Sequence, residues 1–271
     1  MKLTIAHETH YRFEEPARHS IQYLRLTPRP DHAQLVRSWT VSTPGKLRSW
    51  TDGFGNLAHV SVQDGLHEEV AVLVRGEVET MDTTGVLPPH DGLPPLMFLR
   101  ETRYTRLDDG IREFVAPIAE RASDEGQVAT LHNLMWAIRD RVAYQSGSTH
   151  VHGTAGEALT HGYGVCQDHA HLFIAGCRVL GLPARYVSGY LFSEGEEAGE
   201  VGAGVASHAW AEAYVEDLGW VSFDASNGVC ATDAYVRLAV AMDYEGACPV
   251  RGIRRGGGLE EMTVRVQVLN E

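Results

Sequence analysis

The stretch that decides the fold is residues 161–191, which reads HGYGVCQDHAHLFIAGCRVLGLPARYVSGYL. Its middle part, Cys166 to Leu180, is apolar on nearly every side, which predicts a deeply buried helix. Gly181 to Pro183 supplies a helix stop, and Ala184 to Leu191 then has the composition of a strand. A buried helix that leads into a strand indicates a unit in which helices pack on a sheet.

The cysteine of this stretch, Cys166, follows a glycine-rich approach and stands in the first turn of the predicted helix. The thiolate is the reactive form of cysteine, and the positive end of a helix dipole favours it. The free N–H groups of a helix start can also stabilise an oxyanion. This position predicts a nucleophile, although the spacing alone also fits a buried structural thiol.

Two later segments contain the groups that a cysteine nucleophile needs, namely a base and a residue that orients the base. Ser207 to Tyr214 alternates, so His208 and Glu212 share one face of a strand, and the next strand ends at Asp224. A turn centred on residue 216 puts Asp224 opposite His208. A tight turn centred on residue 218 puts Asp224 opposite Glu212 instead, ~13 Å from His208. The spacing therefore leaves the orienting carboxylate open.

Three segments, GYGVCQDHAHLFIAGCRVLGLPARYVSGYL, SHAWAEAYV and GWVSFDASNG, together resemble the bacterial transglutaminase-like superfamily. The resemblance implies a papain-like core and a triad in which Cys166 is the nucleophile, His208 the general base and acid, and Asp224 the orienting carboxylate. The family usually continues its third motif with Asp-Pro-Thr, where this chain has Asp224-Ala225-Ser226. A phenylalanine is common in the family where His169 stands.

The resemblance extends to both ends of the chain and implies an N-terminal β domain. Residues 1–82 show short runs with a two-residue period, which predicts strands in a sandwich-like or barrel arrangement. Residues 83–95 are rich in proline and glycine and predict a linker. Residues 96–271 form the expected catalytic domain, with an amphipathic helix over Val128 to Val142 and a last strand over Met262 to Leu269. The predicted class is α+β, an all-β domain followed by helices packed on an antiparallel sheet.

Charge and hydropathy narrow the classes of partner. The chain has 271 residues, with 23 Lys and Arg against 36 Asp and Glu, for a net charge of -13. Nucleic acid is therefore not an expected partner. No apolar run approaches the ~18 residues of a membrane span, so we expect no membrane insertion and a cytoplasmic location. Ser193 to Gly204 reads as an acidic loop.

The other three cysteines are not expected to take part in the reaction. Cys177 lies three helical turns, ~16 Å, beyond Cys166, which is too far for a disulfide or a shared metal and indicates core packing. Cys230 and Cys248 have no assigned role. We therefore expect Cys166 to react with iodoacetamide before the others.

Histidine pairs raise the alternative of a metal site. His150 and His152 could chelate if they lie on a strand, whereas His169 and His171 on a helix would point ~200° apart. No set of three ligands with familiar spacing emerges, so we expect no metal or cofactor. These histidines are interpreted as exposed polar residues.

Four further polar residues near the motifs are interpreted as structural. Asp168 would interact with the helix dipole from the first turn. Arg185 and Tyr186 would support the core. Glu212 would be structural too, and Glu212→Gln would be mild unless the tight-turn register is the true one.

The predicted chemistry is acyl transfer on a peptide or isopeptide amide through a thioester. Release of the thioester to water gives an amidase or cysteine protease, and release to a lysine-type amine gives a protein-glutamine transglutaminase. Hydrolysis is favoured because no separate acceptor-binding module is evident to exclude water. A catalytically silent binding module and a metal-dependent hydrolase are the alternatives from other classes. The oligomeric state is not predicted.

Overall fold

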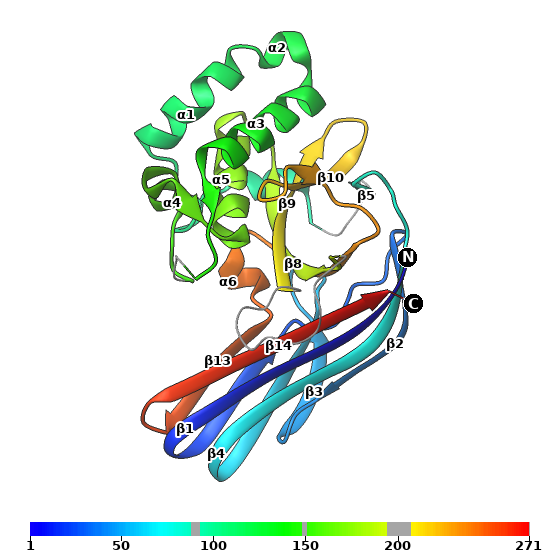
Figure 1. Ribbon diagram of the computed structural model, residues 1–271, viewed down its shortest axis with the longest axis vertical. Helices are drawn as coiled ribbons and strands as arrows, with labels where there is room; N and C mark the ends of the chain where they lie inside the picture. Colours follow the sequence, from blue (N-terminus) through cyan, green and yellow to red (C-terminus); the bar gives the residue numbers. More distant parts are fainter. Residues whose placement is uncertain (88–92, 148–150, 194–206, 271) are drawn as a thin grey trace.

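Two antiparallel sheets and a group of helices build the molecule (Figure 1). The computed structural model describes residues 1–87, 93–147, 151–193 and 207–270. The first sheet contains β1 (Lys2–Leu24), β2 (Gln34–Ser42), β3 (Lys46–Thr51), β4 (Leu57–Thr80), β13 (Val250–Gly256) and β14 (Glu260–Asn270). The central sheet contains β5 (Val86–Leu87), β8 (Ala184–Leu191), β9 (Ser207–Val215), β10 (Gly219–Asp224), β11 (Val229–Cys230) and β12 (Tyr235–Ala241). The α+β class predicted from the sequence is confirmed.

In chain order, most of the helices come between β5 and β8. In space they cover the central sheet (Figure 1). They are the 3-10 helix η1 (Pro95–Leu99), α1 (Asp109–Ala119), α2 (Ala122–Glu125), α3 (Gln127–Arg141), α4 (Ala155–His161), α5 (Cys166–Val179) and α6 (Tyr244–Ala247). A small parallel pair joins β6 (Ala143–Tyr144) to β7 (Tyr163–Gly164). Among the described residues, none of the helices is both long and apolar enough to cross a membrane.

The N-terminal strands form one sheet, in which β1 and β4 are unusually long. Their inward positions alternate with outward ones, as a two-residue period requires. Leu3 and Ile5 on this inner face pack against Tyr190 and Leu238 of the central sheet. The layer that faces the N-terminal sheet is therefore part of the central sheet, and not a second sheet within residues 1–82.

The last two strands belong to the N-terminal sheet, which corrects the sequence-based grouping of residues 96–271. Both β13 and β14 pair with β1, from Leu24↔Val250 through to Leu3↔Asn270. The physical reason is that β1 is long enough to pair with two successive strands, which cover different lengths of it. Figure 1 shows β13 and β14 beside β1, so the two ends of the chain meet in one sheet.

This pairing predicts how the chain behaves after a single cut between residues 83 and 95. We expect the two fragments, produced at an inserted specific protease site, to elute as one complex in gel filtration, because β1 keeps its backbone hydrogen bonds to β13 and β14. The uncut chain with the same insertion is the control. Separation of residues 1–82 in non-denaturing buffer would show that the shared sheet does not hold the two parts together.

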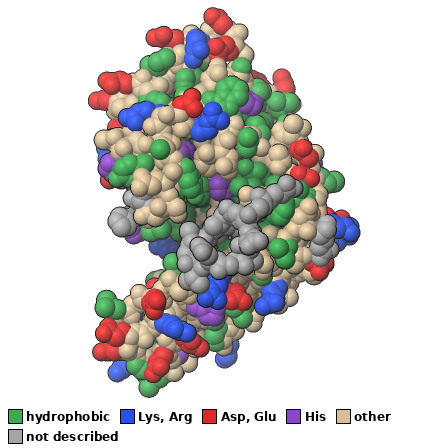
Figure 2. Space-filling view, viewed as in Figure 1, with side chains coloured by type: hydrophobic (Ala, Val, Ile, Leu, Met, Phe, Trp, Pro, Cys, Tyr) green, Lys and Arg blue, Asp and Glu red, His purple; other side chains and the backbone are tan. Residues whose placement is uncertain are grey.

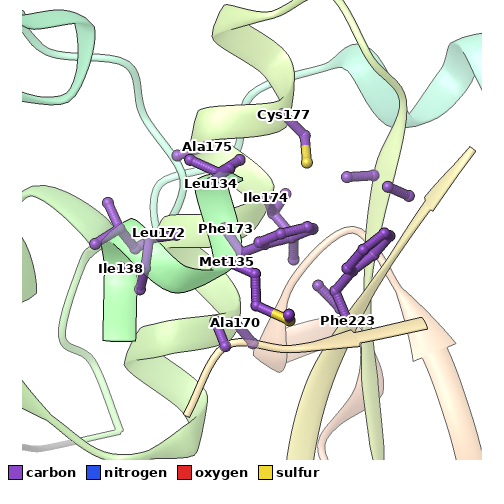
Figure 3. Close-up of a cluster of buried hydrophobic side chains, with 14 of the residues drawn as sticks. Leu134, Met135, Ile138, Ala170, Leu172, Phe173, Ile174, Ala175, Cys177 and Phe223 are labelled. Atoms are coloured by element: carbon purple, nitrogen blue, oxygen red, sulfur yellow. The ribbon is translucent and has the colours of Figure 1, made fainter. Parts of the chain in front are cut away.

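The core of the central unit forms where α3 and α5 pack on the central sheet. Phe173 of α5 stacks on Phe223 of β10, with ring centroids 5.1 Å apart. Figure 3 shows Leu134, Met135 and Ile138 of α3 in the same cluster. The predicted helices over Val128 to Val142 and Cys166 to Leu180 are confirmed as α3 and α5, and two predicted strands coincide with β8 and β9.

On the face shown in Figure 2, acidic and basic side chains are interspersed and do not gather into one patch. The predicted linker lies partly outside the described residues, since 88–92 are not described. The predicted acidic loop lies outside them too, apart from Ser193.

Candidate active site

Cys166 is the first residue of α5, at the helix end where backbone N–H groups are not used within the helix. Asp168 caps this end, because its Oδ2 accepts a hydrogen bond of 2.9 Å from the Val165 N–H. A Cβ on Gly164 would lie 2.8 Å from the Cβ of Asp168, so only glycine fits there. The run from Gly164 to Asp168 thus builds a tight helix start, and Asp168 has the structural role expected of it.

His208 and Asp224 meet on neighbouring strands of the central sheet. The Nε2–H of His208 donates to Oδ2 of Asp224 over 2.7 Å. The hairpin between β9 and β10 has the pairs Val215↔Gly219 to Ala211↔Phe223, with Asp217 at a φ of 67° in its turn. This register lies between the two that the sequence left open. It places Asp224 diagonally from His208 on the same face, a separation that these side chains can bridge.

Six hydrogen bonds hold the Asp224 carboxylate. Its Oδ2 accepts from His208 over 2.7 Å, from the Tyr235 hydroxyl over 2.8 Å and from Asn227 Nδ2 over 2.7 Å. Its Oδ1 accepts from the Ser226 N–H and hydroxyl and from the Asn227 N–H. Burial alone would raise the pKa of Asp224, but the bonds from His208, Ser226 and Asn227 hold it well below its usual range. Asp224 is therefore a carboxylate at any physiological pH.

The His208 imidazole lies between this carboxylate and the Cys166 thiol. Its ring is nearly parallel to that of Trp210 and also contacts Tyr235, with centroids 6.2 and 6.0 Å away. Burial would lower the pKa of His208, but hydrogen bonds to Asp224 and Cys166 and their charges raise it to about 10. Nε2 is occupied by Asp224, so Nδ1 is the nitrogen available to Cys166. At neutral pH this histidine is an imidazolium beside a half-buried thiol.

The environments of the four cysteines predict one reactive thiol. Burial raises the pKa of Cys177, Cys230 and Cys248. Cys166 instead lies at a helix start with the His208 ring beside it, and such surroundings are typical of reactive cysteines. We expect iodoacetamide at about pH 6 to label Cys166 at least ~10-fold faster than the others. His208→Gln is the control and should remove the faster labelling of Cys166. Equal labelling of Cys166 and Cys230 in the wild type would contradict the prediction.

Glu212 lies on the same strand as His208 but does not orient it. Its carboxylate is fully buried and forms ion pairs with Arg185 at 2.6 Å and with Arg237 at 3.1 Å. The Arg185 guanidinium in turn lies 3.9 Å from the centre of the Trp220 ring. Glu212 and Arg185 are structural, as expected from the sequence, and Tyr186 is buried in the core.

Two of the histidines interpreted as exposed are in fact buried, because α5 is enclosed on all sides. Both ring nitrogens of His169 lie 2.9 Å from backbone carbonyl oxygens. His171 stacks on Tyr104 and accepts a hydrogen bond from the Tyr244 N–H, and burial lowers its pKa to about 3. His150 lies outside the described residues, and His152 is exposed. The described part of the chain contains no group of three or more His, Cys, Asp or Glu that could hold a metal.

Three residues around the carboxylate were missed by the sequence analysis. Ser226 and Asn227 follow Asp224 directly, so a turn that folds back onto its side chain could have been suspected from Asp-Ala-Ser-Asn. Tyr235 carries no such signal. It reaches Asp224 only because β12 returns to the far edge of the central sheet beside β8.

A cysteine in the first turn of a buried helix, beside a buried His–Asp pair on an antiparallel sheet, is the arrangement expected of the transglutaminase-like fold class. The chain belongs to the transglutaminase-like superfamily. Residues 112–225 match the family model of that description, and residues 3–79 match the bacterial transglutaminase-like N-terminal region. The resemblance seen in three motifs is therefore confirmed.

The relatives cover almost the whole chain. An uncharacterized protein of Mycobacterium leprae is 31% identical over 98% of both chains. One of Mycobacterium tuberculosis (strain H37Rv) is 28% identical over 92% of this chain and 86% of its own. Among solved structures, a candidate cysteine protease from Cytophaga hutchinsonii superposes with a TM-score of 0.75 and 22% identity, covering 99% of this chain and 90% of that one. The last comparison shows that the two proteins share a fold.

Proposed function

We propose that this protein is a thiol-dependent acyl-transfer enzyme that cleaves peptide or isopeptide amides, with Cys166, His208 and Asp224 as its triad. The observation that carries the proposal is the placement of His208. Its Nε2 is 2.7 Å from a locked carboxylate, and the same ring is hydrogen-bonded to the thiol at the start of α5. A nucleophile, a base and a residue that orients the base are the three parts such chemistry requires.

The reaction has two halves. The Cys166 thiolate attacks the amide carbonyl carbon, and the backbone N–H at the helix start stabilises the oxyanion. The C–N bond breaks as the His208 imidazolium gives its proton to the leaving amine, which leaves a thioester on Cys166. Water then attacks the thioester while His208 takes one of its protons. The acid departs, and the thiolate and imidazolium are restored.

Hydrolysis is the favoured outcome of the second half. Among the described residues no separate module is evident that would bind an acceptor amine and exclude water, so water competes at high concentration. The Cytophaga neighbour is also described as a candidate cysteine protease. A protein-glutamine transglutaminase would use the same triad, with a primary amine in place of water.

A product assay tests the proposal. Glutamine-containing peptides and a lysine isopeptide are incubated with and without a fluorescent primary amine, and products are identified by mass spectrometry. We expect acid products in both cases, no inhibition by chelators and no product with Cys166→Ala. Predominant amine incorporation would instead identify a transglutaminase. Absence of any product that depends on Cys166 would identify a binding module.

The pKa of His208 predicts the alkaline side of the pH profile. The raised pKa means that the folded protein keeps its general acid protonated until the pH approaches about 10. We expect kcat/KM to fall there, well above the ~6.5 of an unperturbed histidine. The same pKa shift also contributes to the stability of the fold. This contribution is fully present below pH ~6.5 and is lost as the pH rises through the folded-state pKa of about 10. A fall of kcat/KM centred near pH 6.5 would show that His208 is not the imidazolium described above.

A further inference from the structure

The outer edge of the central sheet is held by two side-chain amides. Strand β12 pairs with β8 on one side and ends the sheet on the other. On the open side, Gln34 donates to the Arg237 carbonyl over 2.7 Å and accepts from its N–H over 2.9 Å. Asn56 does the same for Val240, over 2.8 and 2.9 Å. Each amide takes the place of a neighbouring strand, which an exposed edge otherwise lacks.

These two amides, here called the amide clamp, come from the N-terminal region. Gln34 is the first residue of β2, and Asn56 lies in the turn between β3 and β4. Asp52 holds Asn56 by accepting from both its backbone N–H and its side-chain amide. Both clamp residues are buried, so loss of their bonds would leave polar groups of β12 without partners. The clamp therefore fixes β12 to the N-terminal sheet region.

Strand β12 begins with Tyr235, whose hydroxyl reaches the active site. This side chain is 8% exposed and donates to Oδ2 of Asp224, the same oxygen that accepts from His208. Its ring also contacts those of His208 and Trp210. Because Tyr235 lies two residues before the clamped Arg237, a shift of β12 would move the hydroxyl away from the carboxylate.

We propose that the N-terminal sheet region is a positioning element of the active site. Gln34 and Asn56 hold β12 so that Tyr235, a positioning residue, keeps the Asp224 carboxylate in line with His208. The proposal rests on the proposed function, because the three residues form a catalytic triad only if that function is correct. It explains why a β region without chemistry of its own is joined to the catalytic unit through buried polar contacts.

The first two measurements of the test follow the His208–Asp224 contact and need no substrate. In the full, nitrogen-15-labelled chain, an imidazole N–H bonded to a carboxylate gives a low-field proton signal, which His208→Gln assigns by its loss. The second readout is the rate of Cys166 labelling by iodoacetamide at about pH 6. Turnover on an amide substrate supplies kcat and KM as a third readout.

Tyr235→Phe removes one hydroxyl and keeps the ring. We expect the low-field signal to shift or broaden and Cys166 labelling to slow about five- to tenfold, the usual scale for a lost buried hydrogen bond. On an amide substrate, kcat should fall about tenfold with KM changed less than about twofold. The matched control is Tyr190→Phe, which removes another buried tyrosine hydroxyl, bonded to His7, on the neighbouring strand.

Gln34→Ala tests the clamp, with Gln22→Ala as the matched control because Gln22 is a buried amide of the same sheet. We expect Gln34→Ala to change the signal and the labelling rate in the same direction as Tyr235→Phe, and both controls to behave as wild type. Wild-type signal, labelling and kcat in Tyr235→Phe would overturn the proposal, even if Gln34→Ala failed to fold. A signal that depends on Tyr235 in a protein without turnover would instead uphold the positioning and reject the proposed reaction.

Discussion

Asp224→Asn is expected to lower kcat by about 10²–10⁴-fold while the fold is kept. The reason lies in the six hydrogen bonds around the carboxylate. The Ser226 and Asn227 donors to Oδ1 would keep the amide oxygen on their side. The amide nitrogen would then face Nε2 of His208 and require that nitrogen to carry no proton. The imidazole proton would move to Nδ1, where it blocks proton transfer from Cys166.

The measurement is kcat on the amide substrate identified above, with circular dichroism as the check on folding. Asp243→Asn is the matched control, because Asp243 is a buried helix cap and asparagine serves well at that position. Its kcat should stay near that of the wild type. Nearly unchanged kcat in Asp224→Asn would mean that another group orients His208.

Glu212→Gln is expected to cost stability, with little direct effect on the triad. The sequence predicted a mild substitution, but the buried ion pairs change that expectation. Glu212 and Arg185 are both fully buried, and Arg237 shares the same carboxylate. Removing its charge takes away the carboxylate that two buried guanidinium groups share, and breaking a buried ion pair typically costs about 3–5 kcal/mol. Urea denaturation should therefore show a large fall in the free energy of unfolding.

An exposed ion pair in the N-terminal sheet provides the comparison. Glu79 pairs with Arg37 over 2.6 Å, and both side chains are well solvated. Glu79→Gln should leave the urea midpoint close to that of the wild type, since solvent screens such pairs. Equal midpoints for Glu212→Gln and Glu79→Gln would show that the buried network does not stabilise the fold as its burial implies.

Local patterns were enough to predict several elements and two of the proposed catalytic positions. Helix α5 and strands β8 and β9 follow from short-range periodicity, which records which face of a segment is buried. The place of Cys166 at a helix start follows from Gly164 and the capping Asp168. His208 follows from alternation along one strand. Helix starts and buried strand faces depend on neighbours within a few residues, so they can be predicted from the local sequence.

The partners of the Asp224 carboxylate depended on tertiary structure. The hairpin register was decided by a three-residue turn with Asp217 in the left-handed region. The sequence of this turn does not predict that conformation. Tyr235 reached Asp224 because β12 lies at the far edge of the sheet. Gln34 reached that edge from a strand about 200 residues earlier in the chain.

The sequence by itself thus determined the helix that carries the thiol, the strand that carries the histidine and the family to which the chain belongs. Only the tertiary structure decided which carboxylate meets His208, and that β13 and β14 join β1 in the N-terminal sheet. The physical reason is that the period of a strand specifies which face is buried and leaves its partner unspecified. Pairing depends on turn geometry and on which edges remain open once the whole chain is packed.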